Sequence, residues 1–89
     1  VSQLGSKVGQ DLKISDYLVD VEIGPQSSIQ DILVFSIKCE QKAYEMYTKL
    51  QEHFEGSSEK TLFEKLAQEE LAHKRNLEEI YDDYVYQEN

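Results

Sequence analysis

The sequence predicts an all-α protein, built as an antiparallel hairpin of two long helices. Apolar residues recur at three- and four-residue spacing in two segments, residues 28–54 and residues 59–84. This spacing is typical of amphipathic helices. Only a few residues, among them Gly56, separate the two segments. A connection this short makes the two helices antiparallel neighbours.

Residues 1–27 differ in character from the helical part. Their first ten residues are polar and contain glycine, and three β-branched residues, Val19, Val21 and Ile23, then alternate with acidic ones. Alternation indicates an extended segment, but the sequence offers no second strand to pair with it. We therefore expect residues 1–27 to form an extended arm along a helical surface, ended by a Gly-Pro pair. The helix pair is expected over residues 28–86.

Small polar residues mark the expected helix ends. Ser27 or Ser28 suits the N-cap of the first helix, because a serine hydroxyl can accept a hydrogen bond from a first-turn N–H group. Gly56 suits the left-handed position just after that helix. Ser57 or Ser58 is then expected to cap the second helix.

Charge and cysteine content narrow the class of protein. The net charge is −9, from 18 acidic and 9 basic residues, which argues against nucleic acid or an anionic membrane as partner. The single cysteine, Cys39, can build neither a disulfide framework nor a four-cysteine metal site. It favours a cytoplasmic location, and neither a membrane-spanning run nor a signal-peptide pattern is present. Since a two-helix hairpin buries little surface, we expect a partner surface from a second copy or another chain.

Three ionisable residues interrupt the apolar stripes. Glu40 lies in the stripe of the first helix, and Glu70 and His73 replace aliphatic residues in the middle of the second. Glu40 lies 16 residues before Gly56, whereas Glu70 and His73 lie 14 and 17 residues after it. All three therefore lie about 21–26 Å from the turn, at one level of the hairpin. Each alone is commonly a surface or boundary residue, but charged groups together on a buried face need compensation.

A metal ion would compensate all three residues at once. A di-iron or di-manganese four-helix bundle takes one Glu from each of two helices and Glu-x-x-His from each of the other two. This chain carries half of that set. Two copies would bring four carboxylates and two imidazoles, and the four negative charges would neutralise two divalent ions. We expect two iron ions per dimer, with manganese as the alternative, because oxygen and imidazole donors suit both metals.

These residues resemble the rubrerythrin-like branch of the ferritin-like superfamily. The similarity covers about residues 28–86 and rests on a Glu-x-x-Ala-x-x-x-Tyr pattern from Glu40 to Tyr47 and on the Glu-x-x-His pair. In that family two helix pairs in one chain are joined by a long crossover, which residues 12–23 resemble. The chain is thus similar to a second half, whose partner would be a second copy or a homologous N-terminal helix pair. The family's four-cysteine electron-donor centre has no counterpart here.

The resemblance also implies roles. Glu70 would bridge the two metals or chelate one, Glu40 would be a terminal carboxylate, and His73 would bind through one ring nitrogen. Tyr47 would donate a hydrogen bond to a ligand carboxylate or pass an electron, with core packing as the alternative. The implied activity is that of an oxidoreductase acting on peroxide or oxygen. A ferroxidase that handles iron, and a metal-free helical interaction module, are the two alternatives.

Overall fold

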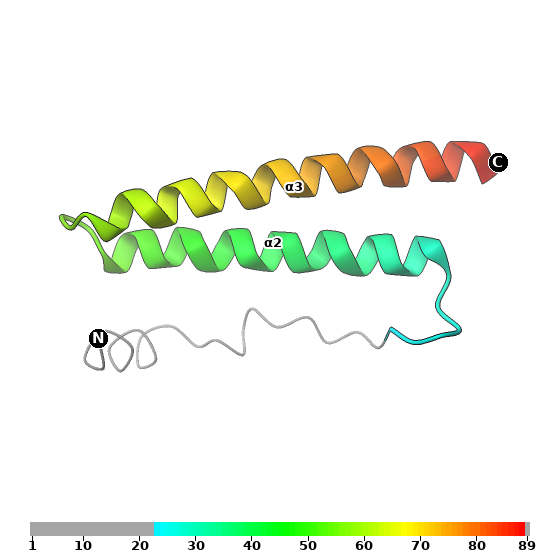
Figure 1. The fold of residues 1–89 in the computed structure, drawn as a ribbon, viewed down its shortest axis with the longest axis horizontal. Coiled ribbons are helices and arrows are strands. Elements are labelled where there is room, and N and C mark those ends of the chain that lie inside the picture. The colour runs from blue at the N-terminus through cyan, green and yellow to red at the C-terminus, as the bar shows by residue number, and fades with distance from the viewer. Residues whose placement is uncertain (1–22, 89) are drawn as a thin grey trace.

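The fold is an antiparallel pair of helices. A computed structural model describes residues 23–88, in which α2 spans Ile29–His53 and α3 spans Glu59–Glu88. Helix α3 runs back along α2, so that its C-terminal end lies beside the start of α2 (Figure 1). The all-α hairpin is confirmed. The arm expected over residues 1–27 falls almost entirely outside the described residues.

Helix α3 is longer than its apolar stripe. The sequence pattern predicted an end near Tyr84, whereas the helix continues to Glu88. No glycine or proline follows Tyr84 to interrupt the backbone hydrogen bonds. The end of the apolar stripe therefore did not mark the end of the helix.

A turn and a capping box begin α2. The Ser27 N–H donates to the Gly24 carbonyl oxygen at 3.0 Å, which closes the turn at the Gly-Pro pair. Ser28 is the N-cap: its hydroxyl accepts from the Asp31 N–H at 3.0 Å, and its own N–H donates to the Asp31 carboxylate at 3.3 Å. Two otherwise unpaired N–H groups are thereby satisfied, and the Asp31 charge lies at the positive end of the helix dipole.

The connection between the helices bends at Gly56. Phe54 closes α2, with its N–H donating to the Leu50 carbonyl oxygen at 3.1 Å. Gly56 has a φ of 83°, the left-handed conformation expected of it, but one residue further from the helix end than expected. The Ser57 hydroxyl donates back to the Phe54 carbonyl oxygen at 2.9 Å, so it holds the loop closed.

Little of the hairpin is buried. The buried hydrophobic residues of the described chain are Leu50, 8% exposed, and Ala67, 1% exposed. Next to them the Phe63 ring stacks between Phe54 and Tyr47, at centroid distances of 5.1 and 6.4 Å. These residues all lie in the half of the hairpin nearer the turn. At the other end a hydrogen bond of 3.1 Å from the Gln30 amide to the Tyr81 hydroxyl joins the two helices.

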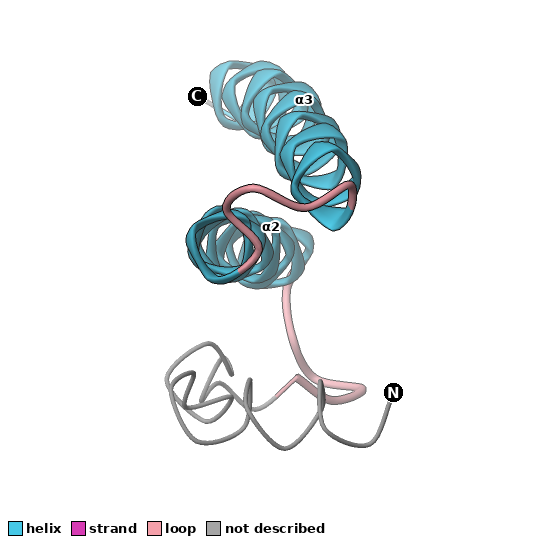
Figure 2. Ribbon diagram, turned by 90° about the vertical axis from the view of Figure 1, so that its left-hand side faces the viewer, coloured by secondary structure: helices cyan, strands magenta, loops and turns pink. Residues whose placement is uncertain are grey.

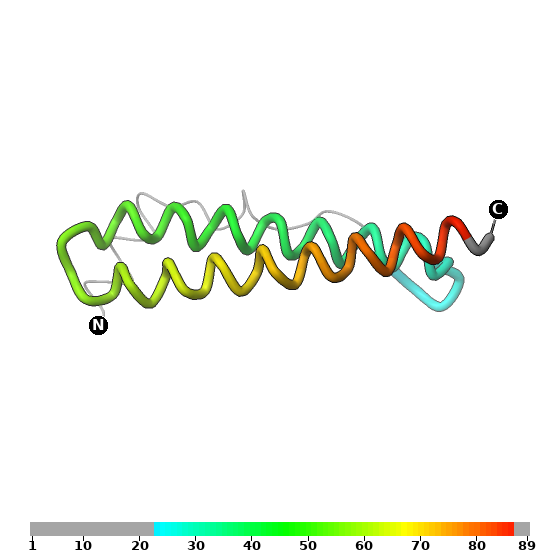
Figure 3. Tube along the Cα trace, turned by 90° about the horizontal axis from the view of Figure 1, so that it is seen from above, coloured from blue at the N-terminus to red at the C-terminus, as the bar shows by residue number. Residues whose placement is uncertain are grey.

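Each helix keeps a side that the other does not cover. The two helices are inclined to one another when viewed end-on (Figure 2), and they cross when viewed from above (Figure 3). Large apolar side chains on the helices are consequently exposed: Ile29, Ile32, Leu62, Ile80 and Tyr86. Ile23, which precedes α2, is exposed as well. Neither described helix is long and apolar enough to cross a membrane.

Candidate metal centre

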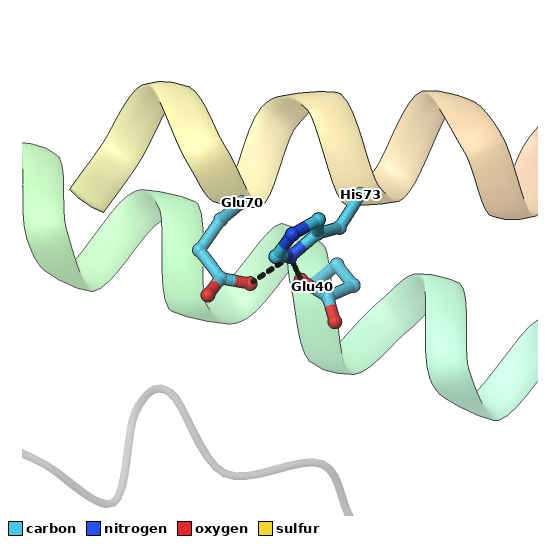
Figure 4. Close-up of side chains that lie close together, drawn as sticks. All are labelled: Glu40, Glu70 and His73. Carbon is cyan, nitrogen blue, oxygen red and sulfur yellow. Dashed lines mark ion pairs between the residues drawn. The ribbon is translucent and has the colours of Figure 1, made fainter. Parts of the chain in front are cut away.

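The structure brings Glu40, Glu70 and His73 together at the middle of the hairpin. Glu40 comes from α2, and Glu70 and His73 come from consecutive turns of α3 (Figure 4). One donor atom from each residue lies within 4.8 Å of the other two. Within the described part of the chain this is the one cluster of three or more potential metal-binding side chains. Their role as ligands stays a prediction.

Close helix packing places the three side chains at one point. Ala67 lies one turn before Glu70 and is almost completely buried between the helices. A methyl side chain lets the two backbones approach closely, so that Glu40 can reach the side chains of α3 across the gap. Because all three residues lie in helix interiors, the regular backbone rather than a loop fixes their positions.

The distances within the cluster suit ligands of a common ion better than hydrogen-bond partners. His73 Nδ1 lies 3.6 Å from Glu40 Oε2 and 3.9 Å from Glu70 Oε2. Both distances exceed the range of a hydrogen bond. Two donors that each lie about 2.1 Å from one ion are separated by about 3 to 4.2 Å, depending on the angle between them.

One oxygen atom of the cluster is orphaned. Glu40 Oε2 is buried and has no hydrogen-bond partner. A buried polar atom without a partner is costly, and a bound cation would remove that cost. The orphaned oxygen and the mixed oxygen and nitrogen donor set therefore both fit a divalent transition-metal ion.

Two lysines close in sequence to these carboxylates pair with other acids. Lys42 lies 3.7 Å from the Glu45 carboxylate on α2, and Lys74 lies 3.6 Å from the Glu78 carboxylate on α3. Among residues 23–86, no ion pair joins a lysine or arginine to the carboxylates of the cluster. In the described chain the carboxylates of the cluster therefore have only the imidazole of His73 as an ion-pair partner, and it carries a positive charge only when protonated.

The cluster is open on the side of His73. The side chains of Glu40 and Glu70 are 25% and 21% exposed, whereas that of His73 is 58% exposed. The sequence pattern placed all three on a buried face, so the exposure of His73 in one chain differs from that expectation. The reason is geometric: α2 covers only one side of α3, and His73 lies at the edge of that side, where its ring reaches Glu40 but stays open to solvent.

Two neighbours of Glu40 have other contacts. The Tyr47 ring stacks on Phe63, which agrees with core packing, while its proposed hydrogen bond to a ligand carboxylate stays a prediction. Cys39 is a half-buried free cysteine. Burial, and secondly the negative charge of Glu40, raise the pKa of its thiol, so it carries less thiolate than an exposed cysteine.

Sequence reasoning did not find the contacts that position the cluster. Ala67 is almost completely buried, and Gln30 on α2 donates a hydrogen bond to Tyr81 on α3. Both depend on contacts between residues that are distant in sequence. The one available signal for the close approach of the helices was Ala67, three residues before Glu70 and six before His73.

The comparisons with known proteins agree with the pattern. Residues 31–89, about two thirds of the chain, match the family model described as Rubrerythrin. No curated protein and no solved structure matches the chain significantly.

Proposed function

The chain belongs to the rubrerythrin family, and from this premise we propose that two copies form a four-helix bundle that holds two iron ions between them. The observation that carries the proposal is the convergence of Glu40, Glu70 and His73 within one hairpin. A ferritin-like di-iron site needs two Glu residues and two Glu-x-x-His pairs from four helices. The hairpin has one of each.

A second copy would complete the donor set. Two hairpins related by a two-fold axis would contribute four carboxylates and two imidazoles, whose four negative charges neutralise two divalent ions. Glu40 and Glu70 would hold the ions through carboxylate oxygens, and His73 would bind through a ring nitrogen. Its exposed position leaves the imidazole accessible from the side on which a partner would dock.

The exposed face of α3 supports a second copy as the partner. Leu62 and Ile80 are each 52% exposed. They lie eleven residues before and seven residues after His73, about three and two helical turns, so the three residues share one face of α3. A partner that covered this face would bury both aliphatic side chains and close the site over His73.

We propose an oxidoreductase activity toward peroxide or oxygen. Iron ions held in this way supply the redox chemistry. The residues of the chain position the ions, and the apolar side chains around His73 exclude water once the partner is docked. Tyr47, two turns beyond Glu40 on the same helix, would donate a hydrogen bond toward the carboxylate ligands.

Metal content tests the proposed site. The full chain is loaded with ferrous iron under anaerobic conditions, desalted and analysed by inductively coupled plasma mass spectrometry. We expect about one iron per chain, lost in Glu70→Ala and kept in Glu69→Ala. The two variants change the net charge equally at adjacent residues, but Glu69 is exposed and outside the cluster. No retained iron, or equal iron in both variants, would support a metal-free helical module instead.

Turnover separates the remaining activities. The iron-loaded protein is mixed with hydrogen peroxide and an artificial reductant, and peroxide consumption is followed over many equivalents. Sustained consumption, absent in Glu70→Ala, supports the oxidoreductase. A ferric product that accumulates in proportion to added ferrous iron, without peroxide turnover, would identify a ferroxidase.

A further inference from the structure

We infer that a single chain binds one divalent transition-metal ion by itself, and that this ion is what allows the second copy to dock. The inference rests on the proposed shared site, because it concerns how that site assembles. It makes the metal ion a switch between a monomeric hairpin and a dimer.

The first step is that half of the site exists before any partner binds. The donor atoms of Glu40, Glu70 and His73 already converge within 4.8 Å in one chain. All three residues lie on regular helices that pack against each other through Ala67. Three protein donors are enough for a mononuclear site whose other positions are filled by water. The exposed side of His73 leaves room for that water (Figure 4).

The second step is that the metal-free cluster opposes docking. Glu40 and Glu70 lie in the middle of the hairpin, beside the exposed imidazole, and no lysine of the described chain pairs with either. A second copy would bring the same two carboxylates to the same place and remove water from all four. Desolvating like charges without a counter-ion is strongly unfavourable. The net charge of −9 on each chain adds a weaker repulsion.

The third step is that one ion per chain reverses this balance. The two positive charges of the ion neutralise Glu40 and Glu70, and the ion also binds Glu40 Oε2, which otherwise has no hydrogen-bond partner. Leu62 and Ile80, which are exposed on the same face of α3, then flank a site whose charge is neutralised. The hydrophobic contribution to docking is then no longer cancelled by charge repulsion. Metal binding should therefore precede dimerisation and strengthen it.

Manganese is the probe for this order of events. Sedimentation velocity of the full chain is measured over a range of micromolar concentrations, with chelator and then with Mn²⁺, beside electron paramagnetic resonance of the Mn²⁺ samples. We expect the dimer dissociation constant to fall at least about tenfold with Mn²⁺, a coupling of ordinary size for linked sites. Dilute samples should show the spectrum of isolated Mn²⁺, and concentrated samples that of a spin-coupled pair.

A charge-neutral variant tests the electrostatic argument without metal. Glu40→Gln/Glu70→Gln keeps the size of both side chains and removes their charge. It should dimerise more tightly than the native chain in chelator and should show no response to Mn²⁺. Glu79→Gln removes one charge from an exposed residue that lies about 120° around α3 from His73, away from the docking face, and should behave like the native chain.

The outcomes separate this inference from the proposed function. If the native chain dimerises equally tightly with chelator and with Mn²⁺, the metal switch is overturned. A spin-coupled Mn²⁺ pair in that dimer would still support the shared site. A chain that binds Mn²⁺ but stays monomeric at every concentration would overturn both. If the double variant dimerises no more tightly than the native chain in chelator, the charge argument on which the switch depends is overturned.

Discussion

Replacement of Glu40 by Gln should stabilise the metal-free protein and weaken the metal-loaded one. Glu40 and Glu70 present carboxylate oxygens within 4.8 Å of each other, and Glu40 Oε2 has no hydrogen-bond partner. Glu40→Gln removes one of two repelling charges. It also replaces an orphaned acceptor with an amide that can donate to the neighbouring carboxylate. The same change removes a predicted metal ligand.

The size of the effect follows from the geometry. The ligand oxygens of the two carboxylates lie no more than 4.8 Å apart. Two unit charges at that limit repel by about 0.9 kcal/mol in water and by about 3.5 kcal/mol at an effective dielectric constant near 20. Glu40 and Glu70 are a quarter and a fifth exposed, so solvent screens part of the larger figure. We expect a gain of about 1–2 kcal/mol in the free energy of unfolding. For a domain of this size that corresponds to about 4–8 °C in melting temperature for each kcal/mol.

The assay is urea unfolding followed by circular dichroism. It is run at about pH 8, where histidine side chains in general carry little charge. In chelator, Glu40→Gln should be more stable than the native chain. With excess Mn²⁺, the native chain should gain stability by mass action and the variant should not, so the order reverses. Glu69→Gln serves as the control, expected to be near-neutral in both conditions. A Glu40→Gln variant that is less stable than the native chain in chelator would refute the idea that the carboxylates repel.

Three further predictions concern the hairpin itself. Leu50→Ala should lower the free energy of unfolding by about 2–4 kcal/mol in urea denaturation, because a buried aliphatic side chain is lost next to the turn. Ser28→Ala should cost about 1 kcal/mol in the same assay, since the hydroxyl that accepts from the Asp31 N–H disappears. The Cys39 thiol should be alkylated by iodoacetamide with a midpoint at higher pH than free cysteine, because burial and the charge of Glu40 raise its pKa and lower its thiolate fraction.

Each of these has a clear contrary result. A Leu50→Ala variant as stable as the native chain would mean that the described core does not hold the helices together. An unchanged Ser28→Ala variant would mean that the capping box adds nothing in solution. An alkylation profile of Cys39 centred at or below that of free cysteine, measured by mass spectrometry, would contradict the raised pKa.

The local chemistry of the helices could be predicted from the sequence, because it depends on residues close together in the chain. The capping box needs only Ser28 and Asp31, three residues apart, and Gly56 marks the one left-handed backbone position of the turn. The common level of Glu40, Glu70 and His73 was also predictable. Since an α-helix rises by a constant amount per residue, counting from the turn places each residue along the hairpin.

The direction in which each side chain faces could not be predicted by counting residues. The apolar stripe of α3 is wide enough to cover both the side that packs on α2 and the side that does not. The sequence therefore determined that the chain is a helical hairpin, that it carries a Glu and a Glu-x-x-His at one height, and that it resembles a family whose model it matches. Only the tertiary structure decided that Ala67 faces α2 while Leu62 and Ile80 remain exposed, with His73 at the edge between the covered and the open side. The physical reason is that the inclination of two packed helices depends on side-chain contacts across the whole interface, which no single helix encodes.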